Sequence, residues 1–167
     1  MNKLKRFVFV IKIQEFYGVG IMFRKYGDIN KNKLKKFTEE TKLKLPADYN
    51  RFLRSYNGGD FGDEYIGFCL RGEKNSIYMD KMLGIGGDPI TDLSSSYSTF
   101  RTEIPKNTII IGETIETGKI LLSCETQNGG IYLWDKDIVL DQSTEENNIY
   151  KIADSFDEFW NRLHSIA

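Results

Sequence analysis

The sequence contains a single histidine, His164, and only two cysteines, Cys69 and Cys124, among its 167 residues. A lone histidine near the end of the chain is poorly placed for a catalytic triad. Two thiols far apart in the sequence, each in an apolar strand-like segment, make neither a zinc cluster nor a disulfide framework. We therefore expect no catalytic histidine, no metal and no cofactor, and the free thiols fit the reducing cytoplasm.

Long hydrophobic runs are also missing. The longest apolar stretches, 7–11 and 109–111, fall far short of the roughly 20 residues that cross a membrane as a helix. The basic start of the chain is followed by Lys12 and by no small-residue cleavage site, which disfavours a secretory signal. With 3 prolines and 40% hydrophobic residues, the composition is that of a folded chain with one core. We expect one domain that does not insert into a membrane.

The net charge of -1 hides an uneven distribution. Residues 1–44 carry 12 Lys and Arg against 4 Asp and Glu, whereas residues 45–167 carry 11 against 20, which gives charges of +8 and -9. An acidic surface repels nucleic acid and attracts basic proteins. The larger part of the chain is therefore suited to a basic protein partner. The simpler alternative is that these acids only keep the protein in solution.

The clearest local patterns are helical. Leu34 and Phe37, three residues apart among charged side chains, predict a surface helix that begins after Asp28. A second helix begins near Pro46, because proline is tolerated at a helix start, and ends at Asn57-Gly58-Gly59, which supplies left-handed residues. Its apolar face follows from the i, i+3, i+4, i+7 spacing of Tyr49, Phe52, Leu53 and Tyr56.

Two more helices are predicted in the second half of the chain. The first has a stripe formed by Ile90, Leu93, Tyr97 and Phe100, although three serines lie in its middle. The last helix starts at a capping box formed by Ser155 and Glu158. Its apolar face comprises Ile152, Phe156, Phe159, Trp160 and Leu163.

Strands are predicted between these helices. Segments 65–70 and, less clearly, 77–85 have strand-like patterns, and three further runs are 108–112, 120–124 and 131–134. Asn128-Gly129 between the last two runs is a hairpin signal, so we expect the three to pair antiparallel. The sequence leaves the secondary structure of residues 1–27 undecided. The alternation of Phe7, Phe9 and Ile11 suggests an added strand, whereas Phe16, Val19 and Phe23 have helix-like spacing.

No motif for catalysis stands out. Gly84-Ile85-Gly86-Gly87 lacks the lysine and hydroxyl of a phosphate-binding loop and is expected to be a turn. A pair of carboxylates such as Asp60 and Glu113 can be imagined for glycoside hydrolysis, but the sequence gives neither their separation nor their pKa values. A hydrolase is therefore the least favoured class of function.

Several of these segments occur in an order that resembles the SUKH superfamily. The first block is Leu45-Pro46-Ala47-Asp48-Tyr49, then Phe52-Leu53 and Asn57-Gly58-Gly59. The second block is Ile104-Pro105, then 109–112, Gly118, 120–124 and the tryptophan-ending segment 131–134, and the closing helix matches at 152–156 and Phe159. Thr117 stands where the family often has an acidic residue, so no role is carried over to it. The resemblance covers residues 28–167, which leaves 1–27 as an N-terminal extension.

The resemblance implies an α+β fold, a single domain with a mainly antiparallel central sheet flanked by helices. It also implies a non-enzymatic bacterial immunity protein, an antitoxin that binds and neutralises a cognate polymorphic or contact-dependent toxin, here a basic toxin of the nuclease type. The alternative is a regulatory or scaffolding adaptor like the yeast cell-wall regulator of the same superfamily. Neither role implies a cofactor, a nucleic acid or a membrane as partner.

Two acidic loops are candidates for the surface that meets a basic toxin, and we expect their side chains to be exposed, with Phe61 as an apolar anchor. The candidates are Asp60, Phe61, Asp63 and Glu64, and, after Trp134, Asp135, Asp137, Asp141, Glu145 and Glu146. The alternative is that Phe61 is buried and the acids only solvate the loops. Charge reversal at Asp60 with Asp63, or at Asp135 with Asp137, is expected to slow toxin association and to leave the fold intact.

Overall fold

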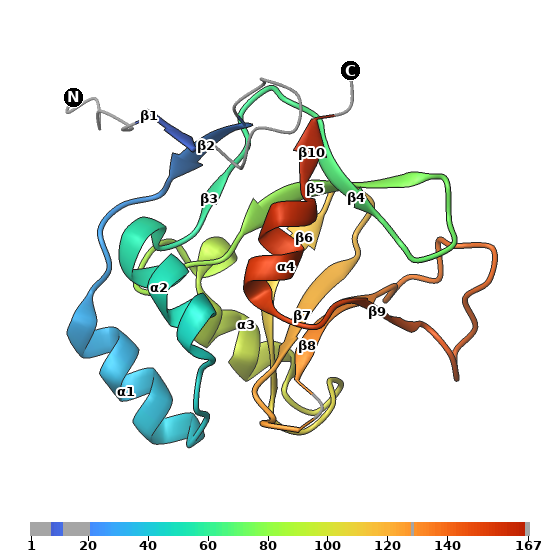
Figure 1. The fold of residues 1–167 in the computed structure, drawn as a ribbon. Coiled ribbons are helices and arrows are strands. Elements are labelled where there is room, and N and C mark those ends of the chain that lie inside the picture. Colours follow the sequence, from blue (N-terminus) through green and yellow to red (C-terminus); the bar gives the residue numbers. More distant parts are fainter. Residues whose placement is uncertain (1–7, 12–20, 128, 166–167) are drawn as a thin grey trace.

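A computed structural model describes residues 8–11, 21–127 and 129–165, and within them ten strands join in one sheet (Figure 1). The strands are β1 (Val8–Ile11), β2 (Ile21–Lys25), β3 (Gly59–Asp60), β4 (Ile66–Cys69), β5 (Ser76–Met82), β6 (Thr108–Thr114), β7 (Lys119–Ser123), β8 (Gly130–Trp134), β9 (Ile149–Ala153) and β10 (His164–Ser165). Their order is β1-β2-β3-β5-β6-β7-β8-β9, with β4 beside β5 and β10 beside β4. All these pairs are antiparallel.

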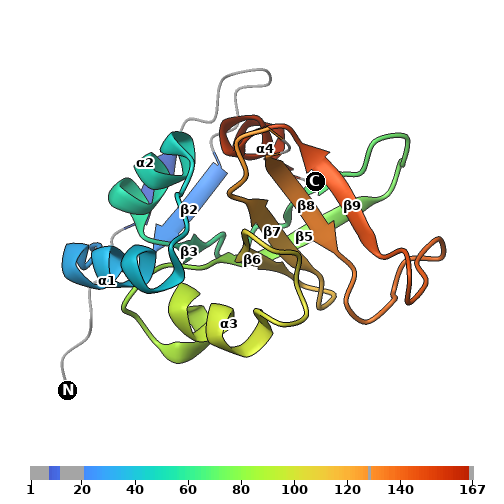
Figure 2. The same ribbon diagram turned by 90° about the horizontal axis from the view of Figure 1, so that it is seen from below.

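Helices cover both faces of this sheet. They are α1 (Lys31–Thr41), α2 (Ala47–Tyr56), α3 (Leu93–Phe100) and α4 (Phe156–Arg162), with a short 3-10 turn, η1 (Pro89–Thr91). Helix α4 contacts α2, β8 and β9, whereas α3 contacts β6, and Figure 2 shows α3 and α4 on opposite sides of the strands β6 to β8. The expected α+β class with a mainly antiparallel sheet is confirmed. None of the described helices is long and apolar enough to cross a membrane.

The first two predicted helices form as the sequence indicates. Asn30 caps α1 by accepting a hydrogen bond from the Lys33 amide, and Leu34 and Phe37 are buried. Helix α2 begins after Pro46 and ends where Asn57 adopts a left-handed conformation, with φ 51° and ψ 47°. The predicted antiparallel order of β6, β7 and β8 is confirmed as well.

Asn57 does more than end α2. Its side chain is buried, accepts a hydrogen bond from the Ile85 amide at 2.7 Å, and donates to the carbonyls of Ile85 and Asp28. A Cβ on Gly84 would lie 2.0 Å from the Asn57 carbonyl oxygen, so only glycine permits this approach. The helix end is thereby joined to two segments far from it in sequence.

Two predicted helices differ from the structure at their starts. Ile90 lies in η1 and is 74% exposed, because Asp92 caps α3 through the Ser95 amide and the helix begins only at Leu93. Ile152 belongs to β9, a strand that the sequence did not indicate. The Ser155 hydroxyl accepts from the Glu158 amide as a capping box requires, but the Glu158 carboxylate accepts from the Asp154 amide instead of returning to Ser155.

The N-terminal segment contributes a strand pair to the sheet. Residues 8–11 pair with β2, and β2 pairs with β3, so the strand reading is correct for the part that is described. Phe23 in β2 is fully buried and its ring lies 5.2 Å from those of Phe61 and Trp160. The helix-like spacing of Phe16 and Val19 falls in 12–20, outside the described residues.

Candidate functional site

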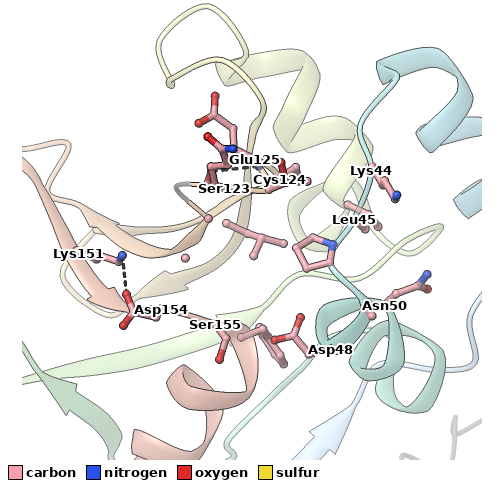
Figure 3. Close-up of a pocket in the computed structure, with 18 residues that line it drawn as sticks. Lys44, Leu45, Asp48, Asn50, Ser123, Cys124, Glu125, Lys151, Asp154 and Ser155 are labelled. Atoms are coloured by element: carbon pink, nitrogen blue, oxygen red, sulfur yellow. Dashed lines mark hydrogen bonds and ion pairs between the residues drawn. The ribbon is translucent and has the colours of Figure 1, made fainter.

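A groove of about 640 Å³ lies where three segments that are distant in the sequence meet (Figure 3). The first is 44–50 at the start of α2, the second is the β7–β8 hairpin around Cys124 and Gly130, and the third is 151–156 at the junction of β9 and α4. Each segment overlaps one of the sequence blocks described above. Residues that identify the fold therefore also line this groove.

Two helix starts are joined at one wall of the groove. The Asp48 carboxylate accepts hydrogen bonds from the Tyr49 amide at 2.8 Å and from the Asp157 amide at 3.1 Å. Arg51 forms an ion pair with Asp157 at 2.8 Å. These contacts hold α2 and α4 in a fixed relation, because an amide at a helix start needs an acceptor from outside its own helix.

Neither Cys124, which lines the groove, nor the buried Tyr49 ionises readily. Burial raises the pKa of the Cys124 thiol to about 12, so the nucleophilic thiolate is scarce at neutral pH. Burial, with a further contribution from Cys124, raises the pKa of the Tyr49 hydroxyl well above its ordinary value. That hydroxyl is buried and has no hydrogen-bond partner among the described residues.

The charged side chains around the groove differ in how they are paired. Lys151 Nζ lies 2.6 Å from the Asp154 carboxylate, and their mutual hydrogen bond lowers the pKa of Asp154 and raises that of Lys151. Lys44 and Glu125, by contrast, form no ion pair with any residue that the structure describes. These two charges are free to meet a ligand.

The first predicted loop, after α2, does not offer the surface that we expected. Phe61 is only 2% exposed and packs against Phe23 and Trp160, so the expectation of an exposed anchor is wrong and the buried alternative is correct. Asp60 forms an ion pair with Arg24 at 2.6 Å and accepts from the Gly62 amide. Glu64 accepts from the Met22 amide, while Asp63 is exposed.

The second predicted loop lies between β8 and β9 and is built around a buried acid. Asp135 is 3% exposed, so the expectation that it is a surface residue is wrong. Its carboxylate accepts hydrogen bonds from the amides of Val139 and Leu140 at 3.0 and 2.8 Å and from the Ser143 hydroxyl at 2.5 Å. Charge reversal at this residue would leave these three donors without an acceptor, so a preserved fold is no longer expected there.

Around this buried acid the loop presents apolar side chains among acids. Ile138 and Val139 are 40% and 50% exposed. Ile138 adopts φ 54°, a left-handed conformation that is rare for a β-branched residue. The remaining predicted acids of the loop are all exposed, namely Asp137, Asp141, Glu145 and Glu146.

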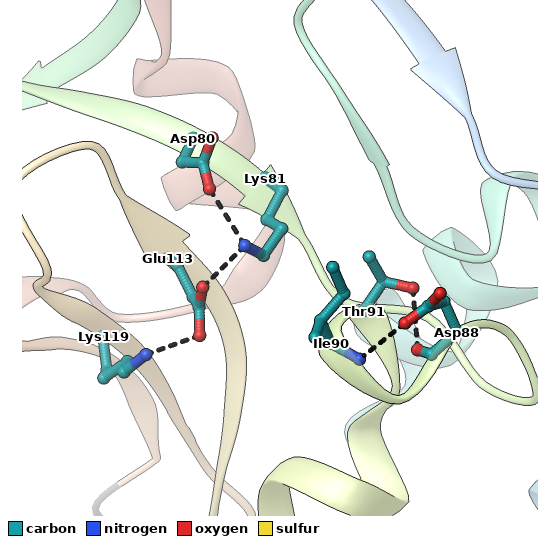
Figure 4. A network of polar contacts seen from close by, with 7 residues as sticks. All are labelled: Asp80, Lys81, Asp88, Ile90, Thr91, Glu113 and Lys119. Carbon is teal, nitrogen blue, oxygen red and sulfur yellow. Dashed lines mark hydrogen bonds and ion pairs between the residues drawn. The ribbon is translucent and has the colours of Figure 1, made fainter.

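The imagined carboxylate pair of Asp60 and Glu113 lies in a row of alternating charges that crosses the sheet. The Glu113 carboxylate forms ion pairs with Lys81 at 2.8 Å and with Lys119 at 2.5 Å (Figure 4). Burial acts to raise the pKa of Glu113, but hydrogen bonds and charge from the two lysines outweigh it and keep the pKa below its ordinary value. A general acid for glycoside hydrolysis needs a raised pKa, so Glu113 is unsuited to that role.

The other candidate catalytic or metal-binding residues do not form a site among the described residues. Among the described residues no three His, Cys, Asp or Glu side chains lie close enough together to hold a metal ion. His164 is exposed in β10 rather than at the end of the last helix, and both cysteines are free thiols. The Gly84–Gly87 segment forms a turn in which the Gly86 amide donates to Asp92.

Comparison with known proteins agrees with this architecture. The model of the SMI1 / KNR4 family (SUKH-1) matches residues 28–162, which is most of the chain. The chain belongs to this family. One relative, the SPbeta prophage-derived uncharacterized protein YokK of Bacillus subtilis (strain 168), is 26% identical, and the match covers 81% of this chain and 75% of that protein. No solved structure matches.

The structure brings together residues of two candidate surfaces that the sequence did not indicate. The groove was missed because its walls come from 44–50, the β7–β8 hairpin and 151–156, whose proximity only the fold reveals. The sequence did not indicate Ile138 and Val139 as surface candidates, because two consecutive apolar residues form no periodic pattern. The acids flanking them were the available signal for that loop.

Proposed function

We propose that the protein is an immunity protein that neutralises a basic toxin by covering its active site. Membership of the SUKH-1 family supports an immunity-type role in general, and the acidic balance of residues 45–167 supports a basic partner. A protein that acts by occlusion needs a surface but no catalytic group, which agrees with the ion-paired state of Glu113 and the protonated thiol of Cys124.

The contact surface that we propose is the β8–β9 loop. Ile138 and Val139 supply exposed apolar area at its centre, and the exposed acids around them supply charge of the sign that a nucleic-acid-binding toxin attracts. The buried Asp135 carboxylate fixes the backbone beneath them, so little ordering entropy is lost on binding. This presentation of two apolar residues on a braced acidic loop is the observation that carries the proposal.

The test uses the purified protein and the toxin encoded beside its gene. Asp137→Lys combined with Glu145→Lys and Glu146→Lys is expected to lower the association rate by about tenfold or more at low salt, and by less at high salt, because steering is screened. Ile138→Ser with Val139→Ser is expected to raise the dissociation rate instead.

The matched control changes the charge equally elsewhere. Glu39→Lys, Glu40→Lys and Glu103→Lys reverse three exposed acids outside the loop, so equal slowing by both triple variants would show a general charge effect and reject the loop. Absence of any complex in a pull-down at moderate salt would reject the immunity role. A gene neighbourhood without a toxin would favour the second candidate, a regulatory or scaffolding adaptor.

A further inference from the structure

We propose that an exposed patch on strands β4 to β6, formed by Tyr65, Tyr78 and Ile115, is a docking surface for a basic protein. This tyrosine patch does not include the β8–β9 loop. It rests on the proposed function in one respect, namely that the docking protein is the same basic partner.

The three side chains of the tyrosine patch come from neighbouring segments of the sheet. Strand β5 pairs with β4 on one side and with β6 on the other (Figure 1). The ring centroids of Tyr65 and Tyr78 lie 5.7 Å apart in an edge-to-face arrangement. The Ile115 amide donates to the Tyr78 carbonyl at 2.9 Å, next to the register pair of Met79 with Thr114. Ile115 therefore lies opposite Tyr78 and on the same face of the sheet.

The tyrosine patch is exposed although its members are large. Tyr65 is 62% exposed and Ile115 54%, which makes them two of the three most exposed large hydrophobic residues in the described part of the chain. Single exposed apolar side chains are ordinary, whereas neighbouring ones with a polar border are typical of an interaction site. Tyrosine is also enriched among the residues that dominate binding energy at protein interfaces.

The border of the tyrosine patch is acidic. An acid stands within two residues of each member of the patch. These acids are Asp63, Glu64, Asp80 and Glu116. Asp63, Asp80 and Glu116 are exposed, and neither Asp63 nor Glu116 forms an ion pair with any residue that the structure describes. Their charges are available to lysine or arginine side chains of a partner.

The bases near the tyrosine patch are already paired. Lys81 and Lys119 both bind the Glu113 carboxylate, and Lys81 also contacts Asp80 at 3.0 Å (Figure 4). With Glu113 counted, five acids stand against these two bases. An acidic surplus remains when two neighbouring groups are included, namely the ion pair of Arg24 with Asp60 and the turn 71–75, which has two bases and one acid. Two copies of the chain facing each other through this patch would repel, whereas a basic protein is attracted.

The backbone beneath the tyrosine patch is held in place. Tyr78 lies in a strand that is hydrogen-bonded on both sides, and the Glu64 carboxylate accepts from the Met22 amide beside Tyr65. The register of β5 against β6 shifts at Asp80, and a bulge of this kind re-aims a side chain. A surface that is ordered before binding loses less conformational entropy when the partner docks.

The experiment selects folded binders from a phage-displayed library of a small helical scaffold, randomised on one face, on the immobilised full-length protein. Most binders are expected to carry a surplus of Lys and Arg. Their Kd is expected to rise at least about tenfold when Tyr65→Ser is combined with Ile115→Ser, because the apolar centre is lost. Asp63→Lys with Glu116→Lys should slow association, and less so at high salt. Ile90→Ser, which removes a still more exposed isoleucine, is the matched control and should leave Kd nearly unchanged.

Circular dichroism and thermal unfolding establish that each variant is folded, as expected for substitutions at exposed positions. Binders that dock elsewhere, that carry no surplus of bases, or that lose as much affinity with Ile90→Ser would overturn the proposal. Self-association of the wild type in light scattering, abolished by Tyr65→Ser with Ile115→Ser, would assign the patch to a second copy and overturn it as well.

The same variants are then measured with the toxin encoded beside the gene. A toxin complex whose association and dissociation rates are unchanged in both double variants would overturn the docking surface and leave the proposed function intact. Absence of any toxin complex would contradict the proposed function alone, because the library contains no toxin and its result on the tyrosine patch stands independently.

Discussion

Lys81 and Glu113 are register partners on β5 and β6, and their charged atoms lie 2.8 Å apart. They stand in the middle of a row of successive partners across five strands, in the order Arg24, Asp60, Lys81, Glu113 and Lys119. Charges alternate along this row, and a slip of one residue between any two strands would remove the match. We infer that the row helps to fix the register of the sheet between its N-terminal half and the β6–β8 core.

Glu113→Gln is expected to lower the free energy of unfolding by about 1–3 kcal/mol, because it leaves two half-buried ammonium groups without their shared carboxylate. For a chain of this length, each kcal/mol corresponds to a fall in Tm of about 2–4 °C. Glu39→Gln is the control, since Glu39 pairs with Lys35 at an exposed position and should change stability by under about 0.5 kcal/mol. Equal effects of the two substitutions in thermal unfolding would contradict the role of the row.

The same row makes stability depend on pH. The two lysines keep the folded-state pKa of Glu113 below the ordinary glutamate value of 4.5, so the contribution of Glu113 to stability is complete above pH 4.5 and is lost as the pH falls through the folded-state pKa. The hydrogen bonds and charges of Glu113 and Asp80 outweigh burial and raise the pKa of Lys81 above 10.5, so that contribution is lost only as the pH rises past that value. Glu113→Gln should therefore flatten the acid limb of a plot of Tm against pH.

Helix α2 and the β6–β8 meander could be predicted because each pattern is local. The i, i+3, i+4, i+7 spacing of α2 needs no partner to be recognised, and the residue pair Asn128-Gly129 indicates a hairpin by its own backbone preferences. Strand β9 was missed because Ile152 and Phe156 happen to be four residues apart, which is also a helical interval.

The errors at the candidate site have a different cause. Phe61 follows two glycines and Asp135 follows the end of a strand, so both positions are predicted to lie in loops. Both residues are nevertheless buried, by contacts that cannot be read from the sequence. Phe61 meets Phe23 from β2, and Asp135 meets the backbone of its own loop after a reversal of the chain. Burial of an acid inside a loop has no compositional signal, so only the fold separates Asp135 from the exposed Asp137.

Asn57→Asp tests the junction at the end of α2. Aspartate keeps the acceptor for the Ile85 amide but loses the donors to the carbonyls of Ile85 and Asp28, and it introduces a charge at a buried position. The free energy of unfolding is expected to fall by at least about 1–3 kcal/mol. Asn147→Asp, the same change at an exposed position, is the control. The measurement is the midpoint of chemical denaturation. Equal shifts of the midpoint in the two variants would contradict a role of the Asn57 side chain in stability.

Tyr49→Phe is expected to preserve or increase stability, in contrast to most substitutions of buried residues. The Tyr49 hydroxyl is buried without a hydrogen-bond partner among the described residues, and an unpaired buried hydroxyl costs about 1–3 kcal/mol. Tyr150→Phe removes a hydroxyl that contacts Ser143 at 2.9 Å and donates to the Asn147 carbonyl, so it should destabilise. A lower Tm for Tyr49→Phe than for Tyr150→Phe would show that the Tyr49 hydroxyl makes a stabilising hydrogen bond.

Asp135→Asn separates the order of the β8–β9 loop from its charge. The substitution weakens the acceptor for the Val139 and Leu140 amides and for Ser143, so these two amides should exchange hydrogen faster and the free energy of unfolding should fall by about 1–3 kcal/mol. Asp137→Asn removes an equal charge two residues away at an exposed position and should leave both quantities nearly unchanged.

The two variants should also differ in toxin binding. Asp137→Asn is expected to lower the association rate in a salt-dependent manner, because only steering is affected. Asp135→Asn is expected to raise the dissociation rate at all salt concentrations, because Ile138 and Val139 lose the fixed backbone that presents them. If Asp135→Asn speeds amide exchange in the loop yet leaves the dissociation rate unchanged, the apolar pair is not at the interface and the toxin contacts another face.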